Sequence, residues 1–340
     1  MGSAHVAWSP QCVLCRGSSP SDTLSAPVSF ATNTTTLSDL IEYRPGHMTH
    51  EEHHPTHKPL SYGVFLPPFA EFAEPKRLVA LARSAEQAGW DGLYLWDHML
   101  TIPGMAVADP FVMTAAIAQA TEGIRLGMLV TPLARRRPWV LARQTATLDR
   151  LSEGRLVVGV GLGLDQRKEF SSFSGEIVDP VERASVLDDS LEILRRLWSG
   201  VPVEFEGGRM WVNSTAFLPI PVQQPLPVWV ACRWPNRRPL ARAARNQGCF
   251  PLFDSGGGDI PGLPEPEQVA AVRSKLLDEG GATDIDIVLR GVSVGAPTHE
   301  LSSRFAALEE AGMTWWLESF GRGEPPAAEV EAVVAAGPPR

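Results

Sequence analysis

Residues 124–163 read IRLGMLVTPLARRRPWVLARQTATLDRLSEGRLVVGVGLG, and this stretch predicts a strand, a helix and a second strand in succession. Residues 124–130 and 155–160 are apolar at nearly every position, and the amphipathic segment 138–151 lies between them. Pro138 suits the first turn of a helix, because the backbone N–H groups there have no partner within the helix. Runs that are apolar throughout are typical of parallel strands, since both faces of such a sheet are buried.

The same alternation continues on both sides of this stretch. The expected strands are residues 62–66, 92–96, 124–130, 155–160, 227–232, 249–253, 285–293 and 314–320. The expected helices are residues 75–88, 110–120, 138–151, 181–198, 236–246, 265–278, 300–311 and 327–336. Eight strand–helix units favour a closed (β/α)8 TIM-like barrel over an open sheet. The doubly wound alternative is weakened because no Gly-x-Gly-x-x-Gly fingerprint follows the first strand.

An insertion interrupts the pattern after the fourth strand. Residues 203–217 (VEFEGGRMWVNSTAF) alternate between apolar and polar positions on either side of Gly207-Gly208. A glycine pair between two such runs predicts a hairpin with a two-residue turn.

Charge and composition narrow the class of protein. The chain has 340 residues and a formal net charge of −9, which argues against nucleic acid or an anionic membrane as its main partner. The sequence contains no apolar stretch of about 18 residues and no secretory signal, so we expect a cytoplasmic protein with no membrane span. Four cysteines are too few for a disulfide scaffold in a chain of this length.

Residues 1–57 differ from the rest, because they are rich in Ser, Thr, Pro and His and have no periodicity. We expect a disordered extension there, followed by a single barrel domain at 58–340, with Met48 or a residue near it as the true start. The five histidines at 47–57 and the pair Cys12 and Cys15 are therefore interpreted as parts of a disordered tract rather than as metal or redox sites.

In barrels of this kind the chemistry lies where strands run into their following loops. Asp97 and His98 follow the second strand, and an aspartate beside a histidine can orient the imidazole and tune its protonation. The alternative is a histidine satisfied by a backbone group. The arginines at 135–137 follow the third strand, where they form a surface or helix-start feature or bind an anion.

Two more strand ends carry candidate residues. Gly161 and Gly163 would let a flat ring approach the backbone closely, although glycines also occur in plain barrel turns. Residues 231–234 precede an expected helix whose first N–H groups could bind phosphate, with Arg233 adding charge. Cys232 has no base partner nearby in the sequence, which argues against a nucleophile.

The order and spacing of four motifs make this sequence similar to the luciferase-like monooxygenase superfamily from about residue 61 to 338. The motifs are GVFLPPF at 63–69, AEQAGWDGLYLWDH at 85–98, ADPFVMTAAIAQATEGIRLGMLVTPLARRRP at 108–138, and ARQTATLDRLSEGRLVVGVGLG at 142–163. The resemblance implies a TIM-like barrel with reduced FMN or the deazaflavin coenzyme F420 in its mouth.

The resemblance also implies roles for individual residues. Asp97 and His98 match the catalytic pair beside the flavin. Met128 and Leu129 match a bulge, often with a non-prolyl cis peptide, that supports the ring. The remaining cofactor-binding positions that it implies are Thr131 at the ring, Gly161 and Gly163 in the turn after the fourth strand, and Ala231, Cys232, Arg233 and Trp234 in the phosphate loop.

Two positions depart from the family pattern. Residues 231–233 read Ala-Cys-Arg where many members have a glycine-rich phosphate loop. Deazaflavin-dependent sugar-phosphate dehydrogenases carry an acid directly after the glycines of the fourth strand, whereas this chain has Leu164 there, followed by Asp165. The second departure argues against a sugar phosphate as substrate.

The resemblance favours, by a small margin, a monooxygenase that uses oxygen and reduced FMN, the latter supplied by a separate flavin reductase. His98 would act there as acid or base on a small organic substrate, and the aromatic residues expected in the mouth favour an apolar one. The alternatives are hydride transfer with coenzyme F420 and a non-catalytic flavin-binding or accessory barrel. A metal-dependent hydrolase is disfavoured because few His and carboxylate ligands stand at strand ends. A homodimer is a further implication of the resemblance.

Overall fold

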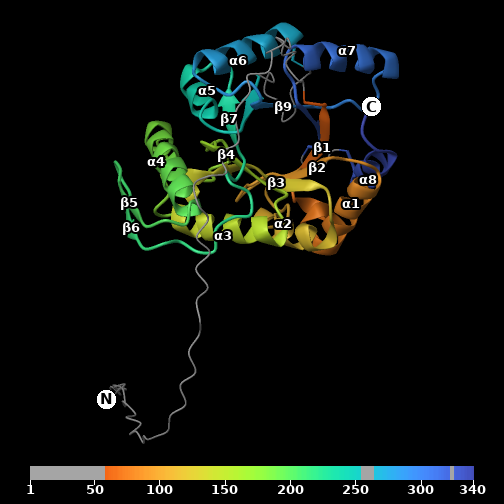
Figure 1. Cartoon of the computed structure of the whole chain (residues 1–340). Coiled ribbons are helices and arrows are strands. Elements are labelled where there is room, and N and C mark those ends of the chain that lie inside the picture. Colours follow the sequence, from red (N-terminus) through yellow and green to blue (C-terminus); the bar gives the residue numbers. More distant parts are fainter. Residues whose placement is uncertain (1–57, 254–263, 322–324) are drawn as a thin grey trace, which may run out of the picture. The chain divides into compact units, whose positions relative to one another are not determined.

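Eight parallel strands close into a barrel in the computed structural model, which describes residues 58–253, 264–321 and 325–340 (Figure 1). Around the barrel the order is β1, β2, β3, β4, β7, β8, β9, β10 and back to β1. The barrel strands are β1 Ser61–Leu66, β2 Gly92–Leu95, β3 Arg125–Pro132, β4 Leu156–Gly161, β7 Val228–Arg233, β8 Gly248–Leu252, β9 Asp286–Gly291 and β10 Trp315–Ser319. The expected TIM-like (β/α)8 barrel is therefore confirmed.

A helix follows each barrel strand and covers the outside of the barrel (Figure 1). The helices are α1 Pro75–Gln87, α2 Pro110–Ala120, α3 Pro138–Leu151, α4 Pro180–Trp198, α5 Arg237–Ala243, α6 Pro266–Asp278, α7 Thr298–Glu310 and α8 Ala327–Ala336, with short 3-10 turns η1 Ala70–Ala73 and η2 Leu133–Arg135. Several begin with proline after an acidic residue. Asp109 and Asp179 accept hydrogen bonds from the free N–H groups of α2 and α4, which stabilises those helix starts.

Side chains fill the barrel interior as well as the layer between strands and helices. Inside, the rings of Tyr94, Trp229 and Trp315 contact one another with centroids 5.1 to 5.8 Å apart. The neighbouring Trp316 points the other way and packs under the helices. Successive strand residues face opposite sides, so two adjacent tryptophans can serve two cores. The barrel is thus a packed core, and ligands can approach only its ends.

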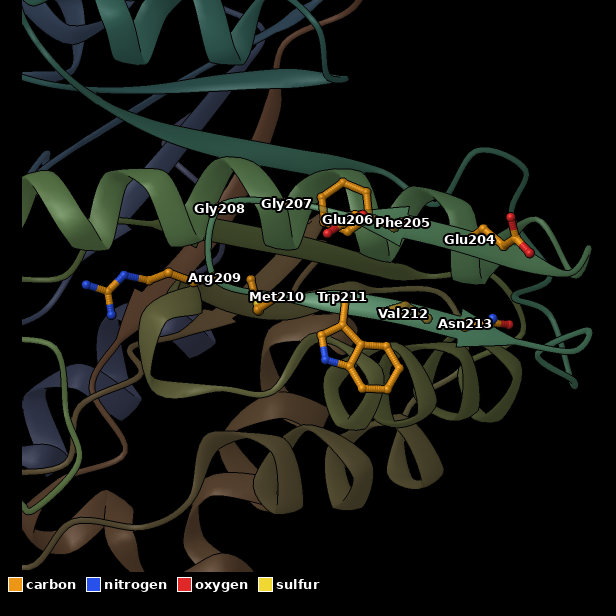
Figure 2. Close-up of a pocket in the computed structure, with 10 residues that line it drawn as sticks. All are labelled: Glu204, Phe205, Glu206, Gly207, Gly208, Arg209, Met210, Trp211, Val212 and Asn213. Atoms are coloured by element: carbon orange, nitrogen blue, oxygen red, sulfur yellow. The ribbon is translucent and has the colours of Figure 1, made fainter.

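The expected hairpin is present outside the ring of barrel strands, beside α4 (Figure 1). Its strands are β5 Val203–Glu206 and β6 Trp211–Ser214. The expected turn at Gly207-Gly208 is wrong in length, because the loop spans residues 207–210 and the Gly207 N–H donates to the Met210 carbonyl at 2.8 Å. Figure 2 shows the ten residues of this hairpin that line a surface hollow. None of the candidate residues lines this hollow.

The expected disordered extension 1–57, with its histidines, Cys12, Cys15 and the proposed start at Met48, lies outside the described residues. In the part of the chain that is described, no helix combines the length and apolarity that crossing a membrane requires.

Candidate active site

Asp97 and His98 follow β2 at the carboxyl end of the barrel, but their side chains have different partners. The Asp97 carboxylate is 1% exposed and accepts from Nε and Nη2 of Arg136 at 3.1 and 2.8 Å. Arg135 donates from Nη2 to the Asp97 backbone oxygen at 2.8 Å. Asp97 therefore serves as the counter-charge of two arginines. The expectation that it orients the imidazole of His98 is wrong.

A different carboxylate holds His98. Glu169, in the loop between β4 and α4, lies with Oε2 at 2.8 Å from Nδ1 of the imidazole. Its other oxygen, Oε1, accepts from the backbone N–H groups of Met99 at 2.7 Å and Leu100 at 3.1 Å. Nη1 of Arg135 is 3.5 Å from the same oxygen. Glu169 thus ties the loop after β2 to the loop after β4.

The surroundings of Glu169 favour its charged form. The side chain is only 5% exposed, and burial alone raises the pKa of the carboxyl. The hydrogen bond with His98, the backbone N–H of Leu100 and the charge of Arg135 lower the pKa more than burial raises it. The carboxyl is therefore ionised near neutral pH and can only accept hydrogen bonds.

Aromatic rings surround His98 without covering it. The imidazole is 28% exposed, and its centroid lies 5.9 Å from the ring of Phe69 and 5.8 Å from that of Trp96. Phe65 packs against Trp96 at 5.5 Å. Nδ1 is bonded to Glu169, whereas Nε2 has no hydrogen-bond partner among the residues that the structure describes. This nitrogen is therefore available to a ligand.

A bulge in β3 lies opposite β4, one residue later than expected. The pairing between the two strands shifts between Met128 and Thr131, and the cis peptide joins Leu129 to Val130 rather than Met128 to Leu129. Leu129 packs in the barrel interior. The side chain that the bulge leaves partly exposed is that of Val130.

Two expected ring contacts at β3 do not face the mouth. Met128 packs in the outer core, where the Thr114 hydroxyl lies 3.4 Å from its sulfur. Thr131 is 0% exposed and pairs with Val160, whose side chain lies in the same outer core. Paired residues on adjacent strands point to the same face of the sheet. The side chains of Met128 and Thr131 thus face the helices.

Gly161, which ends β4, and Gly163, which follows it, have different roles. A Cβ atom on Gly161 would lie 3.0 Å from Val130 Cγ2 and 3.4 Å from Ala231 Cβ, so Gly161 faces the barrel interior beside the bulge. Gly163 has φ +73°, and a Cβ atom there would meet Phe170 at 2.8 Å. Gly163 therefore lets the loop fold closely over Phe170, directly beside Glu169.

The loop after β7 divides between the two faces of the sheet. Ala231 is partly exposed and packs against the interior cluster. Cys232 is fully buried in the outer core, where its thiol contacts the Pro239 carbonyl at 3.2 Å, so its side chain faces away from the mouth and its place in a phosphate loop stays a prediction. Burial, together with Cys232, raises the pKa of the adjacent Cys249 thiol well above its ordinary value. Arg233 is exposed.

The last part of this loop gives limited support to the expected phosphate site. Trp234 packs beside Phe253, with centroids 6.4 Å apart. The following helix has only seven residues and starts at Arg237, so a set of free N–H groups directly after Arg233 is not formed. The guanidinium of Arg233 remains as the group that can meet an anion here.

Asp165 does not replace the acid that Leu164 displaces. Its Oδ1 accepts from the backbone N–H groups of Phe170 at 2.7 Å and Ser171 at 3.1 Å, and these bonds lower the pKa of the carboxyl. Asp165 is thus occupied in shaping its own loop. Leu164 is 54% exposed.

A model of the family described as luciferase-like monooxygenase matches residues 46–251, more than half of the chain. The chain belongs to the luciferase-like monooxygenase family. Curated relatives include an F420-dependent glucose-6-phosphate dehydrogenase from Gordonia bronchialis, 31% identical over 192 residues, which are 56% of each chain. A second one, from Mycolicibacterium smegmatis, is 31% identical over 244 residues, 67% of this chain and 71% of the relative. With the first relative the match spans only about half of either protein.

Solved structures support the fold of this family member. An F420-dependent secondary alcohol dehydrogenase, in complex with an F420-acetone adduct, superposes with a TM-score of 0.66 at 15% identity, over 83% of this chain and 98% of that one. A monooxygenase from Streptomyces bottropensis gives 0.64 at 22% identity, over 81% and 96%. At such identities the likeness concerns the barrel alone.

Proposed function

We propose that this chain is an oxidoreductase that transfers a hydride between a small organic substrate and the deazaflavin coenzyme F420. The proposal rests on the state of His98 at the mouth of the barrel. Nδ1 of its imidazole is bonded to Glu169, and Nε2 has no hydrogen-bond partner among the described residues. An imidazole in that state can accept or release one proton at Nε2. Exchange of an alcohol and a carbonyl by hydride transfer requires one such proton carrier.

The choice between the two cofactors rests on the relatives. The sequence favours FMN by a small margin, but the curated relatives from Gordonia bronchialis and Mycolicibacterium smegmatis are both named F420-dependent. Their identity of 31% extends over 192 and 244 residues of this chain. Coenzyme F420 is therefore the better proposal, and it would need no flavin reductase as a partner. A homodimer stays a prediction.

The residues at the mouth fit a flat cofactor ring. Val130 on the bulge, Gly161 at the end of β4 and Ala231 in β7 are neighbours, and none of them has a large side chain. A Cβ atom at Gly161 would occupy the space between the other two. These residues would support the ring, and the exposed Arg233 would meet an anionic group of the cofactor.

When bound, coenzyme F420 supplies a ring carbon that accepts or donates a hydride and reacts poorly with oxygen. The protein supplies the proton path and the orientation. In the oxidation of an alcohol, Nε2 of His98 would take the hydroxyl proton, and the carboxylate of Glu169 would stabilise the imidazolium that forms. Phe69 and Trp96 would limit the access of water to this nitrogen.

An apolar substrate fits this mouth better than the sugar phosphate of the named relatives. Met99, Ile102 and Leu164 are exposed apolar residues on the loops after β2 and β4. Leu164 stands where the resemblance places an acid, and the Asp165 carboxylate is bonded to its own loop. We therefore propose a secondary alcohol or ketone with an apolar body as the substrate class.

Binding of the cofactor tests this proposal first. The full chain is titrated with coenzyme F420 and, anaerobically, with reduced FMN, and binding is followed by fluorescence or absorbance. We expect coenzyme F420 to bind and FMN to bind more weakly. Binding of FMN alone would favour the monooxygenase hypothesis. If neither coenzyme F420 nor FMN bound, a non-catalytic barrel would be favoured.

A pair of variants tests the location of the cofactor. Ala231→Leu extends a side chain into the mouth, whereas Ala120→Leu adds the same atoms at the end of α2, at the opposite end of the barrel. We expect Ala231→Leu to weaken the binding of coenzyme F420 at least about tenfold, since overpacking of about 1–3 kcal/mol acts directly on the bound ring. Equal binding by both variants would place the cofactor elsewhere.

A further inference from the structure

We infer that Glu169 is the positioning residue of the site, which fixes His98 with its proton on Nδ1 and presents Nε2 to the barrel mouth. The inference rests on the proposed function for its catalytic meaning. The tautomer that His98 adopts depends on its contacts with Glu169 and not on the cofactor or the substrate.

The hydrogen-bond inventory around Glu169 assigns the proton. Among the described residues, Oε1 faces only groups that can donate, namely the backbone N–H groups of Met99 and Leu100 and the guanidinium of Arg135. Oε2 faces Nδ1 of His98 at 2.8 Å. An ionised carboxylate offers no proton, so Nδ1 must carry the hydrogen of this bond. The neutral imidazole then has its lone pair on Nε2.

The same contacts fix the direction of the ring. The Glu169 carboxylate bonds the imidazole of His98 and also the backbone N–H groups of Met99 and Leu100. One carboxylate therefore holds both the loop after β2 and the side chain of His98. Phe69 and Trp96 flank the ring and limit its rotation. Because the imidazole is already oriented, less entropy is lost when the reacting groups reach the geometry of the reaction.

The charges that face His98 come from three loops. Glu169, from the loop after β4, is in direct contact, and Arg135, from the turn after β3, approaches Glu169 at 3.5 Å. Asp97, beside His98 in the chain, is paired with Arg136 at 2.8 Å. Because Asp97 and Arg136 compensate each other, Glu169 is the main group that stabilises the imidazolium, and Arg135 opposes it in part.

The substitution Glu169→Gln tests the assignment, because the structure dictates how the amide must turn. The backbone N–H groups of Met99 and Leu100 both donate to the position of Oε1, and the Arg135 guanidinium lies 3.5 Å from it, so the amide oxygen must lie there. The amide NH2 then faces Nδ1 of His98 as a donor, which forces Nδ1 to accept. The neutral imidazole must move its proton to Nε2, and the charged imidazole loses its partner.

The measurement is the ¹⁵N chemical shift of the His98 ring nitrogens across a pH titration of the full chain without cofactor. The His98 signals are assigned by their loss in His98→Gln, and the exposed His299 serves as a reference in the same spectra. In the wild type we expect the proton of neutral His98 on Nδ1. In Glu169→Gln we expect it on Nε2. A wild-type His98 that carries its proton on Nε2 overturns the inference whatever the variants do.

Matched variants separate positioning from folding. Glu176→Gln removes another carboxylate from the same loop. The Glu176 carboxylate has no contact with His98 in the described structure, so this variant should leave the His98 spectrum unchanged. Glu169→Asp keeps an acceptor and should retain the proton on Nδ1, which keeps the inference testable if Glu169→Gln does not fold. An inverted tautomer in Glu169→Asp, or an unchanged one in folded Glu169→Gln, would contradict it.

Turnover distinguishes this inference from the proposed function. If the chain reduces or oxidises a substrate with coenzyme F420, we expect Glu169→Gln to lower kcat by about 10²-fold to 10⁴-fold, and Glu176→Gln to change it little. If the spectra behave as expected but the wild type shows no hydride transfer, the positioning role stands and the proposed function fails.

Discussion

The substitution Asp97→Asn separates two roles for a residue that the family resemblance places in the catalytic pair. In the structure the Asp97 carboxylate is 1% exposed and bonds Arg136, while Arg135 approaches its other oxygen at 3.7 Å. An asparagine keeps the shape and one acceptor oxygen but removes the charge. If Asp97 is the counter-charge of the arginines, its replacement must cost stability in the chain without any ligand.

The expected cost follows from the burial of all three side chains. Arg135 is 6% exposed and Arg136 is 20% exposed, so neither guanidinium recovers full hydration when the carboxylate is lost. Removing one partner of a buried ion pair costs about 3–5 kcal/mol, and the remaining acceptor places Asp97→Asn near the lower end, at about 3 kcal/mol. For a domain of this size that corresponds to a fall in Tm of roughly 5 °C.

Urea denaturation at pH 7 and a thermal melt measure this change. The control is Asp188→Asn, because Asp188 also makes two hydrogen bonds to one arginine, Arg242, at 2.6 and 2.9 Å, but is largely exposed. Arg242 is 11% exposed but the Asp188 carboxylate is 55% exposed, so water can replace the lost charge and the control should lose less stability. Equal losses in the two variants, or a stable Asp97→Asn that has lost only turnover, would refute the structural role and favour catalysis by Asp97.

Three further predictions concern His98, Gly163 and two carboxylates that accept backbone hydrogen bonds. His98→Gln should lower turnover at least about 10²-fold in steady-state kinetics. Urea melts should show a change in the free energy of unfolding of under about 1 kcal/mol. A variant with wild-type turnover would remove His98 from the mechanism. Gly163→Ala should destabilise the chain by about 1–3 kcal/mol more than Gly104→Ala. Both glycines have positive φ, but only at 163 would the new methyl meet side chains, at 2.8 and 2.9 Å, and equal unfolding free energies would contradict this. Burial raises the pKa values of Glu86 and Glu169, but their hydrogen bonds lower them more, so folding lowers both values. At Glu86 these bonds come from backbone N–H groups. Their contribution to stability is therefore complete above about pH 5 and is lost as the pH falls through the unfolded value of about 4.3 and then through the lower folded values. Urea melts from pH 7 to pH 3 test this, and Glu86→Gln should approach wild-type stability at the acid end.

The barrel could be predicted from the sequence because largely apolar strands alternate with helices, most of which are amphipathic. The segment 124–163 shows this most clearly, and its strands and helix appear as β3, α3 and β4. The same property hides which face each residue takes. Residues 227–232 are apolar throughout, so nothing in them indicates that Ala231 faces the interior and Cys232 the helices. Only the closed register of the barrel decides that.

The partner of His98 could not be predicted for a different physical reason. Glu169 lies in a loop that also contains Asp165, Arg167 and Lys168, and sequence alone does not distinguish a buried carboxylate from a solvated one. Sequence proximity favoured Asp97 as the partner. Chain neighbours at a strand end point in different directions, however, so adjacency is a poor guide to contact there. The bulge misplaced by one residue has the same origin, since it depends on the pairing with β4.

The loops after β2, β3 and β4 form one connected structure, and this leads to a last prediction. Gly163 lets the loop after β4 close over Phe170, which places Glu169. The Asp97 carboxylate lies 3.7 Å from Arg135, which in turn lies 3.5 Å from Glu169. Neither Gly163 nor Asp97 bonds the imidazole, yet both should influence it. We expect folded Gly163→Ala and Asp97→Asn to broaden or shift the ¹⁵N signals of His98, in proportion to their loss of turnover, because interacting residues of one hydrogen-bond network are not independent.

The control for this coupling is a substitution of equal thermodynamic cost elsewhere in the barrel, such as Trp90→Phe, which removes the hydrogen bond from Nε1 to the Val334 carbonyl at 2.9 Å. That site joins the start of β2 to α8, at the opposite end of the barrel from His98. It should lower stability and leave the His98 signals in place. If it disturbed them as much as Gly163→Ala does, general loosening of the barrel would explain the effect, and the three loops would have no special connection to the imidazole.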